Sequence, residues 1–80
     1  MDFESAQNIV KERHSSFDND TLLCFYKFYK QATVGNVNTD RPGMFSLKER
    51  AKWDAWKSVE GLSKEEAENE YVKTLEKLSD

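Results

Sequence analysis

The sequence predicts a small, all-helical domain, and three observations lead to this fold class. Apolar residues recur at spacings of three and four in four separate segments, which is the period of an amphipathic α-helix. Glycine occurs three times and proline once, too rarely for a turn-rich β fold. Hydrophobic residues make up 38% of the chain, enough to form a core. A chain of 80 residues has room for a single domain, residues 1–80.

The first helix is expected over Asp2–Arg13. Its apolar stripe is formed by Phe3, Ala6 and Val10, at spacings of three and four. The polar stretch 15–20 then separates it from the second helix.

The second helix is expected to begin at Asp20 or Thr21 and to end near Val34. Asn19 or Asp20 is a suitable N-cap, and Gly35 stands where a left-handed C-terminal cap is needed. Apolar and aromatic residues extend around much of this helix, which predicts packing on more than one side. One face carries Leu22, Phe25, Tyr26 and Tyr29.

A connection of about twelve residues, 36–47, follows the second helix. It is long for so small a domain, which makes it a candidate functional segment. The run Arg41–Met44 predicts a tight turn with Pro42 and Gly43 at its central positions. The run Ser46–Glu49 matches a helix capping box.

The third helix is expected over Leu47–Val59, with Trp53 and Trp56 facing the core and Gly61 ending it.

The fourth helix opens with a second capping box, Ser63–Glu66, and continues to about Leu78. Its apolar stripe consists of Ala67, Tyr71, Leu75 and Leu78. Four such helices predict a compact bundle, but periodicity does not distinguish between the possible topologies.

Charge is unevenly distributed along the chain. The segment Lys27–Lys57 holds seven basic and three acidic residues and is therefore +4, although the whole chain is −3. An acidic protein with a basic middle is poorly suited to wrapping a nucleic-acid backbone, so we expect no nucleic-acid partner. It is well suited to holding one compact anion.

The chain offers little for catalysis or metal binding. Cys24 has no second cysteine with which to form a disulfide, and His14 is the only histidine, so we expect no metal site. No nucleophile motif, phosphate-binding glycine loop or membrane-spanning segment occurs. These features favour a binding protein over an enzyme, in the cytoplasm.

Two groups of residues could bind an anion. Tyr26, Tyr29 and Lys30 share one helical face, where two phenols and an ammonium could stack on a ring and hold a phosphate. Taken alone, the three fit core tyrosines and a solvated lysine better. Lys48 and Lys52 also share a face, and either a solvated surface or a bound anion would explain them.

Three sequence runs resemble the acyl-CoA-binding protein family in combination, and the resemblance extends over essentially the whole chain. They are Tyr-Lys-Gln-Ala-Thr at 29–33, Asn-Thr-Asp-Arg-Pro-Gly at 38–43 and Ala-Lys-Trp-Asp-Ala-Trp at 51–56. The family fold is an antiparallel four-helix bundle of up-down-down-up topology, in which the 36–47 stretch would be the long connection.

The resemblance implies a ligand and the residues that hold it. The family ligand is a fatty acyl thioester of coenzyme A, and no cofactor is implied. Tyr26 and Lys52 would address its 3′-phosphate and Tyr29 its adenine. Lys30 would take phosphate charge, and Tyr71, which also matches a core position, would align the acyl and pantetheine end. Family contacts fall on Tyr26, Tyr29, Lys30, Lys52, Tyr71 and Lys11.

The resemblance also implies a role, that of an intracellular carrier and pool former for medium- to long-chain acyl-CoA in lipid metabolism. We expect a monomer that donates its ligand to acyl-CoA-using enzymes or membranes. Two other classes stay open from the residues: a helical module that binds a partner helix, and a thioesterase or acyltransferase, for which no nucleophile or base is evident.

The chain departs from the family pattern at five positions. Gln7 and Arg13 replace small and apolar residues in the first helix, where they would alter helix packing or the acyl groove. Asn36, Ser46 and Glu49 are the other departures. None is expected to touch the head-group contacts.

Overall fold

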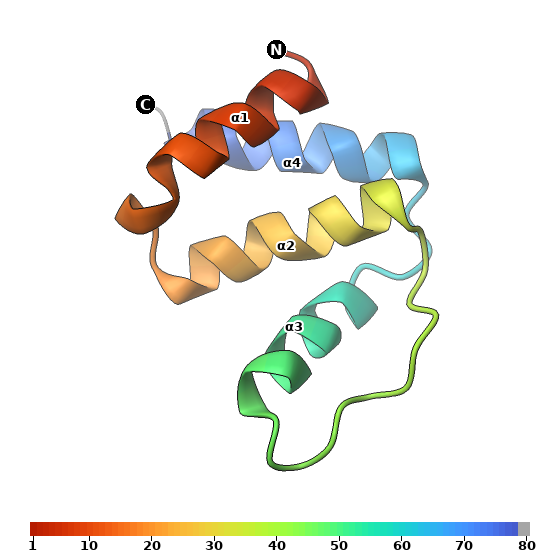
Figure 1. The fold of residues 1–80 in the computed structure, drawn as a ribbon. Helices are drawn as coiled ribbons and strands as arrows, with labels where there is room; N and C mark the ends of the chain where they lie inside the picture. Colours follow the sequence, from red (N-terminus) through yellow and green to blue (C-terminus); the bar gives the residue numbers. More distant parts are fainter. Residues whose placement is uncertain (79–80) are drawn as a thin grey trace.

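A computed structural model of the protein describes residues 1–78 (Figure 1). Within this range every regular element is helical, which confirms the predicted fold class. The elements are α1 (Phe3–Arg13), the short 3₁₀ helix η1 (His14–Ser16), α2 (Asn19–Thr33), α3 (Leu47–Lys57) and α4 (Lys64–Leu78). In Figure 1, α1 and α4 run in one direction and α2 and α3 in the other, so the topology is up-down-down-up.

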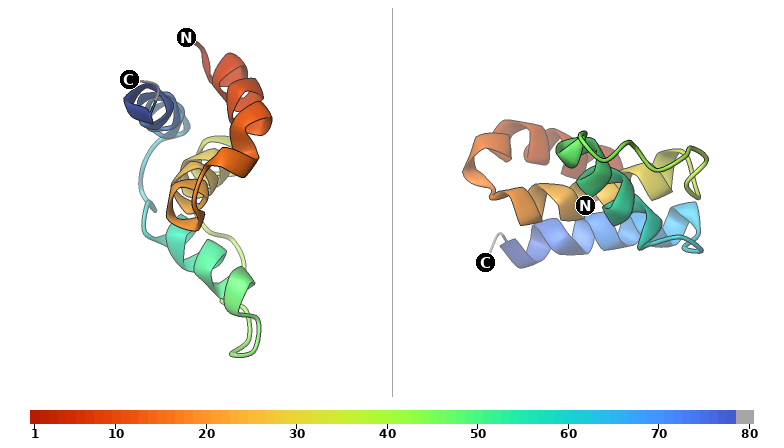
Figure 2. Two further views of the ribbon diagram at one scale, coloured as in Figure 1. Left: turned by 90° about the vertical axis from the view of Figure 1, so that its left-hand side faces the viewer. Right: turned by 90° about the horizontal axis from the view of Figure 1, so that it is seen from below.

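Helix α2 is the centre of the bundle. It packs against α4 and against α3, while α1 packs against α4. The side view of Figure 2 places α1 and α4 at one end of the molecule and α3 with its preceding loop at the other. Helix α2 therefore packs on two sides, as its broad apolar surface predicted.

The main core lies where α1, α2 and α4 meet. Tyr71 is its largest aromatic member, and its ring centroid lies 5.1 Å from that of Phe3 and 5.1 Å from that of Phe25. The other buried members of this cluster are Ala6, Val10 and Leu75. Helix α3 contributes nothing to it and is anchored instead through Trp56, which is buried against α2.

Asp residues cap the first two helices. The Asp2 Oδ1 atom accepts a hydrogen bond from the Ser5 amide at 2.8 Å. Asp18 does the same for Thr21 at 2.8 Å, so α2 begins at Asn19 and the predicted cap at Asn19 or Asp20 is wrong. Asp18 wins because its backbone is extended, with ψ of 172°, which aims the carboxylate at the first-turn amides.

Only one of the two predicted capping boxes forms. Ser63 Oγ accepts from the Glu66 amide at 3.0 Å, and Glu66 Oε1 accepts from the Ser63 amide at 3.0 Å. Ser46 is the residue before α3, but its side chain makes no capping bond. Its ψ of 65° turns the hydroxyl away, and its amide is used by the Gly43 carbonyl at 3.0 Å.

The tight turn in the long connection lies two residues later than predicted. The Ser46–Gly43 hydrogen bond places Met44 and Phe45, rather than Pro42 and Gly43, at its centre. The chain before the turn is attached to α3 by a two-pronged Arg41–Asp54 ion pair, at 2.9 and 2.7 Å.

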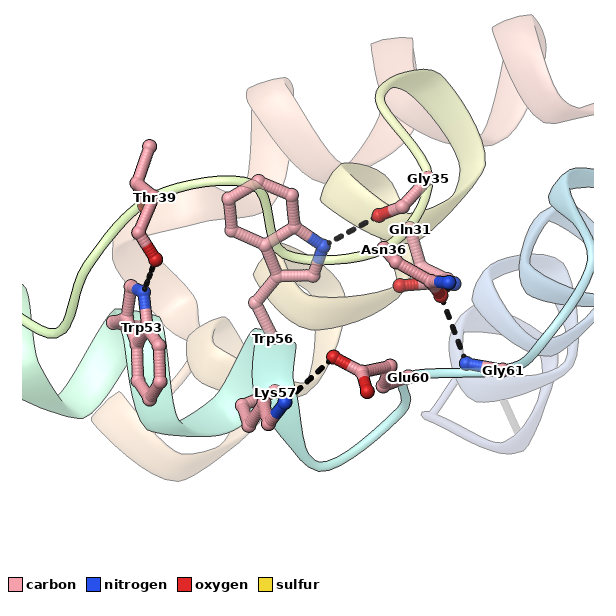
Figure 3. Close-up of polar contacts among 9 residues, drawn as sticks. All are labelled: Gln31, Gly35, Asn36, Thr39, Trp53, Trp56, Lys57, Glu60 and Gly61. Carbon is pink, nitrogen blue, oxygen red and sulfur yellow. Dashed lines mark hydrogen bonds and ion pairs between the residues drawn. The ribbon is translucent and has the colours of Figure 1, made fainter.

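Both tryptophans of α3 donate hydrogen bonds to backbone carbonyls of the chain that follows α2 (Figure 3). Trp53 Nε1 donates to the Thr39 carbonyl at 3.0 Å, and Trp56 Nε1 donates to the Gly35 carbonyl at 2.8 Å. Trp56 is buried, as predicted, whereas Trp53 is half-buried. Gly35 has φ of +101° and ends α2 in the left-handed conformation expected of it.

A buried amide network joins the end of α2 to the α3–α4 connection (Figure 3). Gln31 is 1% exposed, and its Nε2 donates to Asn36 Oδ1 at 2.9 Å and to the Leu62 carbonyl at 2.8 Å. Asn36 Oδ1 also accepts from the Gly61 amide at 2.9 Å. Helix α3 itself stops at Lys57, two residues before the predicted end. No helix among residues 1–78 is both long and apolar enough to cross a bilayer.

Candidate ligand-binding site

The centre of the candidate site is one face of α2. Tyr26, Tyr29 and Lys30 lie three and four residues apart and therefore project from the same side of the helix. None of them is a fully buried core residue: Tyr26 and Lys30 are half-buried, and Tyr29 is 40% exposed. The interpretation of these tyrosines as ordinary core residues is therefore wrong, because a core position would bury them.

Lys52 of α3 meets Tyr26 of α2. The Lys52 Nζ atom lies 5.6 Å from the centroid of the Tyr26 ring, within the range of a cation–π contact. Partial burial, and to a smaller extent the nearby Glu49 carboxylate, raise the pKa of Tyr26 above its ordinary value of 10.0. The phenol therefore stays protonated at neutral pH and can donate a hydrogen bond to an anion.

Lys30 is held over the second tryptophan of α3. Its Nζ atom lies 4.9 Å from the Trp56 ring centroid, and the indole is fixed by its bond to Gly35. Neither Lys30 nor Lys52 forms an ion pair with a carboxylate in the described part of the chain. Both ammonium groups thus lie against aromatic faces, without a carboxylate partner among the described residues.

Tyr29 and Tyr71 extend the site toward α1 and α4. The Tyr29 ring lies against Phe3, with centroids 6.4 Å apart. Tyr71 is 4% exposed, so its ring belongs to the core. Burial first, and the neighbouring Tyr29 phenol second, raise the pKa of Tyr71 to about 12. The second effect indicates that the two phenols lie near each other.

Lys11 stands apart from the other five residues. It is exposed on α1 and forms no hydrogen bond, ion pair or ring contact with them within residues 1–78. Helix α1 packs on α4 rather than on α3, where the two positioned lysines lie. Lys48 is likewise exposed and unpaired among the described residues.

Glu49 lies near one of the candidate site residues. It lies three residues before Lys52, one helical turn away, and its carboxylate is close enough to raise the pKa of Tyr26. Glu49 is thus a departure from the family pattern that lies near a predicted head-group residue, although no hydrogen bond joins the two side chains in the described part of the chain. A negative charge stands beside a phenol that is a candidate for binding phosphate.

Sequence reasoning missed the amide network that supports this face. Gln31 follows Lys30 directly, and its bonds to Asn36 and Leu62 fix the last turn of α2. Gln31 is a polar residue at a helical position that faces the interior, and this is the feature by which the sequence could have indicated such a network. Nothing in the sequence indicates its partners, which lie 5 and 31 residues away.

A hollow of about 340 Å³ lies elsewhere on the surface and contains none of the six predicted residues. Phe28 contributes to it from the side of α2 opposite Tyr26. The remaining lining residues are Leu62, Glu66, Asn69, Glu70 and Lys73. Two carboxylates in a small, mixed lining suit neither a phosphate nor an acyl chain, and we do not assign the ligand to it.

The arrangement on α2 and α3 suits an anion attached to a flat ring. Two cations, a half-buried phenol and an exposed phenol surround one surface, and aromatic faces can stack on a heterocycle. No group of three or more His, Cys, Asp or Glu side chains that could hold a metal occurs among residues 1–78.

Comparison with known proteins gives one consistent result. The family profile described as "Acyl CoA binding protein" matches residues 1–75. An acyl-CoA-binding protein of Brassica napus is 56% identical over 77 residues, covering 96% of this chain and 84% of the relative. Acyl-CoA-binding domain-containing protein 6 of Arabidopsis thaliana is 62% identical, with the same two coverages.

A crystal structure agrees with these relatives. Oryza sativa Acyl-CoA-Binding Protein 2 superimposes with a TM-score of 0.90 at 49% identity, covering 96% of this chain and 86% of that one.

Proposed function

Because the chain belongs to the acyl-CoA-binding protein family, we propose that it binds medium- to long-chain fatty acyl esters of coenzyme A at the α2–α3 surface. The observation that carries this proposal is the pair of lysines held over aromatic rings, Lys52 on Tyr26 and Lys30 on Trp56. The relatives of this protein, in sequence and in structure, are named for the same ligand.

The head group would be held mainly by charge and stacking. Lys52 and Tyr26 would bind the 3′-phosphate, Lys30 would bind phosphate oxygens, and Tyr29 would stack on the adenine. Each charge-assisted hydrogen bond contributes roughly 1.5–3 kcal/mol. Stacking of a base on an aromatic ring contributes roughly 1–3 kcal/mol. The entropy lost on association offsets much of this total, so coenzyme A alone should bind weakly.

The acyl chain would supply the rest of the affinity. Leu22 lies one turn before Tyr26 on the same face of α2 and is half-buried, so it offers apolar surface next to the head-group residues. Each buried methylene contributes roughly 0.8 kcal/mol, and a long chain therefore adds on the order of 10 kcal/mol before costs. In this proposal Tyr71 helps align the acyl and pantetheine end through its proximity to Tyr29, and Lys11 adds a further positive charge from α1.

We propose a monomeric, cytoplasmic carrier rather than an enzyme. Its ligand would be held by groups that bind and stack, and released to enzymes or membranes that use it. Incubation of the protein with palmitoyl-CoA, followed by a free-thiol assay, tests this: release of coenzyme A in proportion to protein would show turnover and overturn the carrier role.

Calorimetric titration tests the ligand. Palmitoyl-CoA should bind far more tightly than coenzyme A or palmitate, because only the thioester engages both halves of the site. Equal affinities for palmitoyl-CoA and coenzyme A would contradict an acyl-binding surface, and equal affinities for palmitoyl-CoA and palmitate would contradict the head-group assignment.

A matched pair of lysines on α2 tests the head-group residues. Lys27 Nζ lies 5.1 Å from the Phe28 ring centroid, whereas Lys30 Nζ lies 4.9 Å from that of Trp56, so the two lysines make similar contacts with different rings. Lys30→Ala should weaken palmitoyl-CoA binding by about tenfold or more, the equivalent of one charge-assisted bond, with little change in melting temperature. Lys27→Ala should leave affinity nearly unchanged. Equal effects of the two substitutions would remove Lys30 from the site.

A further inference from the structure

Three large apolar side chains are exposed at the start of α3. Met44, Phe45 and Leu47 are 70%, 97% and 75% exposed, and together we call them the apolar tip. Met44 and Phe45 form the centre of the Gly43–Ser46 turn, and Leu47 is the first residue of the helix. Apolar surface left in water is unfavourable, and a contiguous exposed apolar patch typically marks an interaction site.

The apolar tip is convex and lies at one end of the molecule. In the left view of Figure 2 the loop and the start of α3 project at the end away from α1 and α4. The tip is held out by the contacts that tie the preceding chain to α3, the Arg41–Asp54 ion pair and the Trp53–Thr39 hydrogen bond.

Positive charge surrounds the apolar tip in an otherwise acidic protein. The segment 41–52 holds four basic residues and one acidic residue, a net charge of +3, whereas the whole chain is −3. Arg41 is neutralised by Asp54, but Lys48 and Lys52 form no ion pair among the described residues. An acidic body and a basic tip would orient the molecule toward a negative surface.

We propose that the apolar tip docks the protein on the surface of bilayers that contain anionic phospholipid. Met44, Phe45 and Leu47 would enter the boundary between head groups and acyl chains, and Lys48 would remain among the lipid phosphates. A short apolar insertion with adjacent basic residues is the pattern of reversible interfacial binding. Lys52, one turn after Lys48, would bring the ligand-binding face close to the bilayer.

A lipid surface fits the apolar tip better than a protein partner does. Stable protein interfaces bury about 800 Å² on each partner, much more than three side chains on a turn provide. A convex tip needs a complementary groove in a protein, whereas a bilayer interface deforms around it. The small inserted area also predicts weak, reversible attachment, because a single short anchor gives marginal membrane affinity.

Vesicle flotation of the full chain, without acyl-CoA, tests this proposal. The protein should float with phosphatidylcholine–phosphatidylserine vesicles, less with phosphatidylcholine alone, and less at high salt. Phe45→Ser should weaken the partition coefficient at least tenfold, the equivalent of about 1.4 kcal/mol, and Phe45→Trp should retain it. Lys48→Gln should weaken it about fivefold, as expected for one basic residue at an anionic surface.

Matched controls and a solution assay separate this role from the alternatives. Leu78→Ser removes a 45%-exposed apolar side chain from α4 and should not change flotation. Phe45→Ser should leave palmitoyl-CoA affinity in solution unchanged. A parallel loss of that affinity would make the tip part of the ligand site, and loss of a dimer in ultracentrifugation would make it a self-association surface. Either result, or equal flotation of Phe45→Ser and the unaltered chain, would overturn the proposal.

Discussion

Glu49 places a negative charge beside the candidate binding surface. Its carboxylate lies near Tyr26, and one turn later Lys52 supplies the positive charge that would hold phosphate. A negative charge beside an anion site opposes binding, by an amount that depends on separation and on screening by salt.

Replacing that carboxylate should therefore strengthen ligand binding. Glu49→Gln is expected to raise palmitoyl-CoA affinity about two- to fivefold at low salt, corresponding to a partly exposed charge interaction. The gain should shrink as salt is added. Glu76→Gln, the same change on the exposed surface of α4, is the control in calorimetric titration. A similar gain from both variants would assign the effect to net charge rather than to position.

Tyr71 makes a second prediction at the residue scale, for alkaline conditions. Burial raises its folded-state pKa to about 12 from an ordinary value of 10.0, so the folded protein favours the neutral phenol. Between these values the unfolded chain loses the proton and the folded chain keeps it, and stability must fall as pH rises. The fall should be on the order of 2 kcal/mol by pH 12.

Denaturant unfolding at increasing pH measures this loss. Tyr71→Phe keeps the ring that packs on Phe3 and Phe25 but removes the titrating group. Its free energy of unfolding should decline less above pH 10 than that of the unaltered chain. An identical decline in both proteins would mean that other groups cause the alkaline loss.

At the scale of elements, the two predicted capping boxes give a direct comparison. Ser63 and Glu66 exchange two hydrogen bonds at the start of α4, whereas the Ser46 side chain makes none at the start of α3. Ser63→Ala should lower the free energy of unfolding by about 1 kcal/mol, the usual cost of losing a cap. Ser46→Ala should change it by only a few tenths, within the range of ordinary surface substitutions. Equal losses in urea unfolding would contradict the assigned caps.

The same elements show what the sequence could and could not predict. All four α-helices among residues 1–78 were predicted within two residues at each end, because helical periodicity and the flanking polar and glycine residues mark them. The caps of α2 and α3 and the position of the turn were not predicted, because they depend on backbone angles that the sequence does not show. The Arg41–Asp54 ion pair, which joins residues 13 apart in the sequence, was not predictable either.

The candidate site was predictable to a similar degree. Helical spacing placed Tyr26, Tyr29 and Lys30 on one face, and the family resemblance added Lys52 from α3. Spacing along one helix cannot show which side chain of another helix lies opposite. For that reason the position of Lys30 over Trp56 and the proximity of Glu49 to Tyr26 appeared only in the structure.

At the scale of the whole molecule, the long connection and α3 form a separate functional half. The core of α1, α2 and α4 forms without α3, which is attached by Trp56 and by the Gln31–Asn36 amide network. Lys30, which lies over Trp56 of α3, Lys52 and the exposed apolar tip all lie on the α3 side of α2. The main core and these candidate binding features therefore lie in different parts of the molecule.

The carboxylates that cap helices and pair with Arg41 contribute to the stability of the fold in acid. Hydrogen bonds from Ser5, Thr21 and Ser63 lower the pKa of Asp2, Asp18 and Glu66, and Arg41 lowers that of Asp54. Each group has a lower pKa folded than unfolded, so its contribution is complete above the ordinary values of 3.8 for Asp and 4.5 for Glu. As pH falls below those values, the unfolded chain takes up protons first and stability declines.

Thermal unfolding across acidic pH should therefore show a plateau above about pH 5 and a steep decline below it. The double variant Asp18→Asn/Glu66→Gln separates charge from hydrogen bonding, since both new side chains still offer an oxygen to the same amides. Near neutral pH its melting temperature should be lower than that of the unaltered chain, because a negative charge at a helix N-terminus stabilises the helix. Its decline in acid should be shallower, because two of the four titrating groups are gone. If the two proteins lose stability in parallel below pH 4.5, the helix caps are not the groups whose protonation unfolds this bundle.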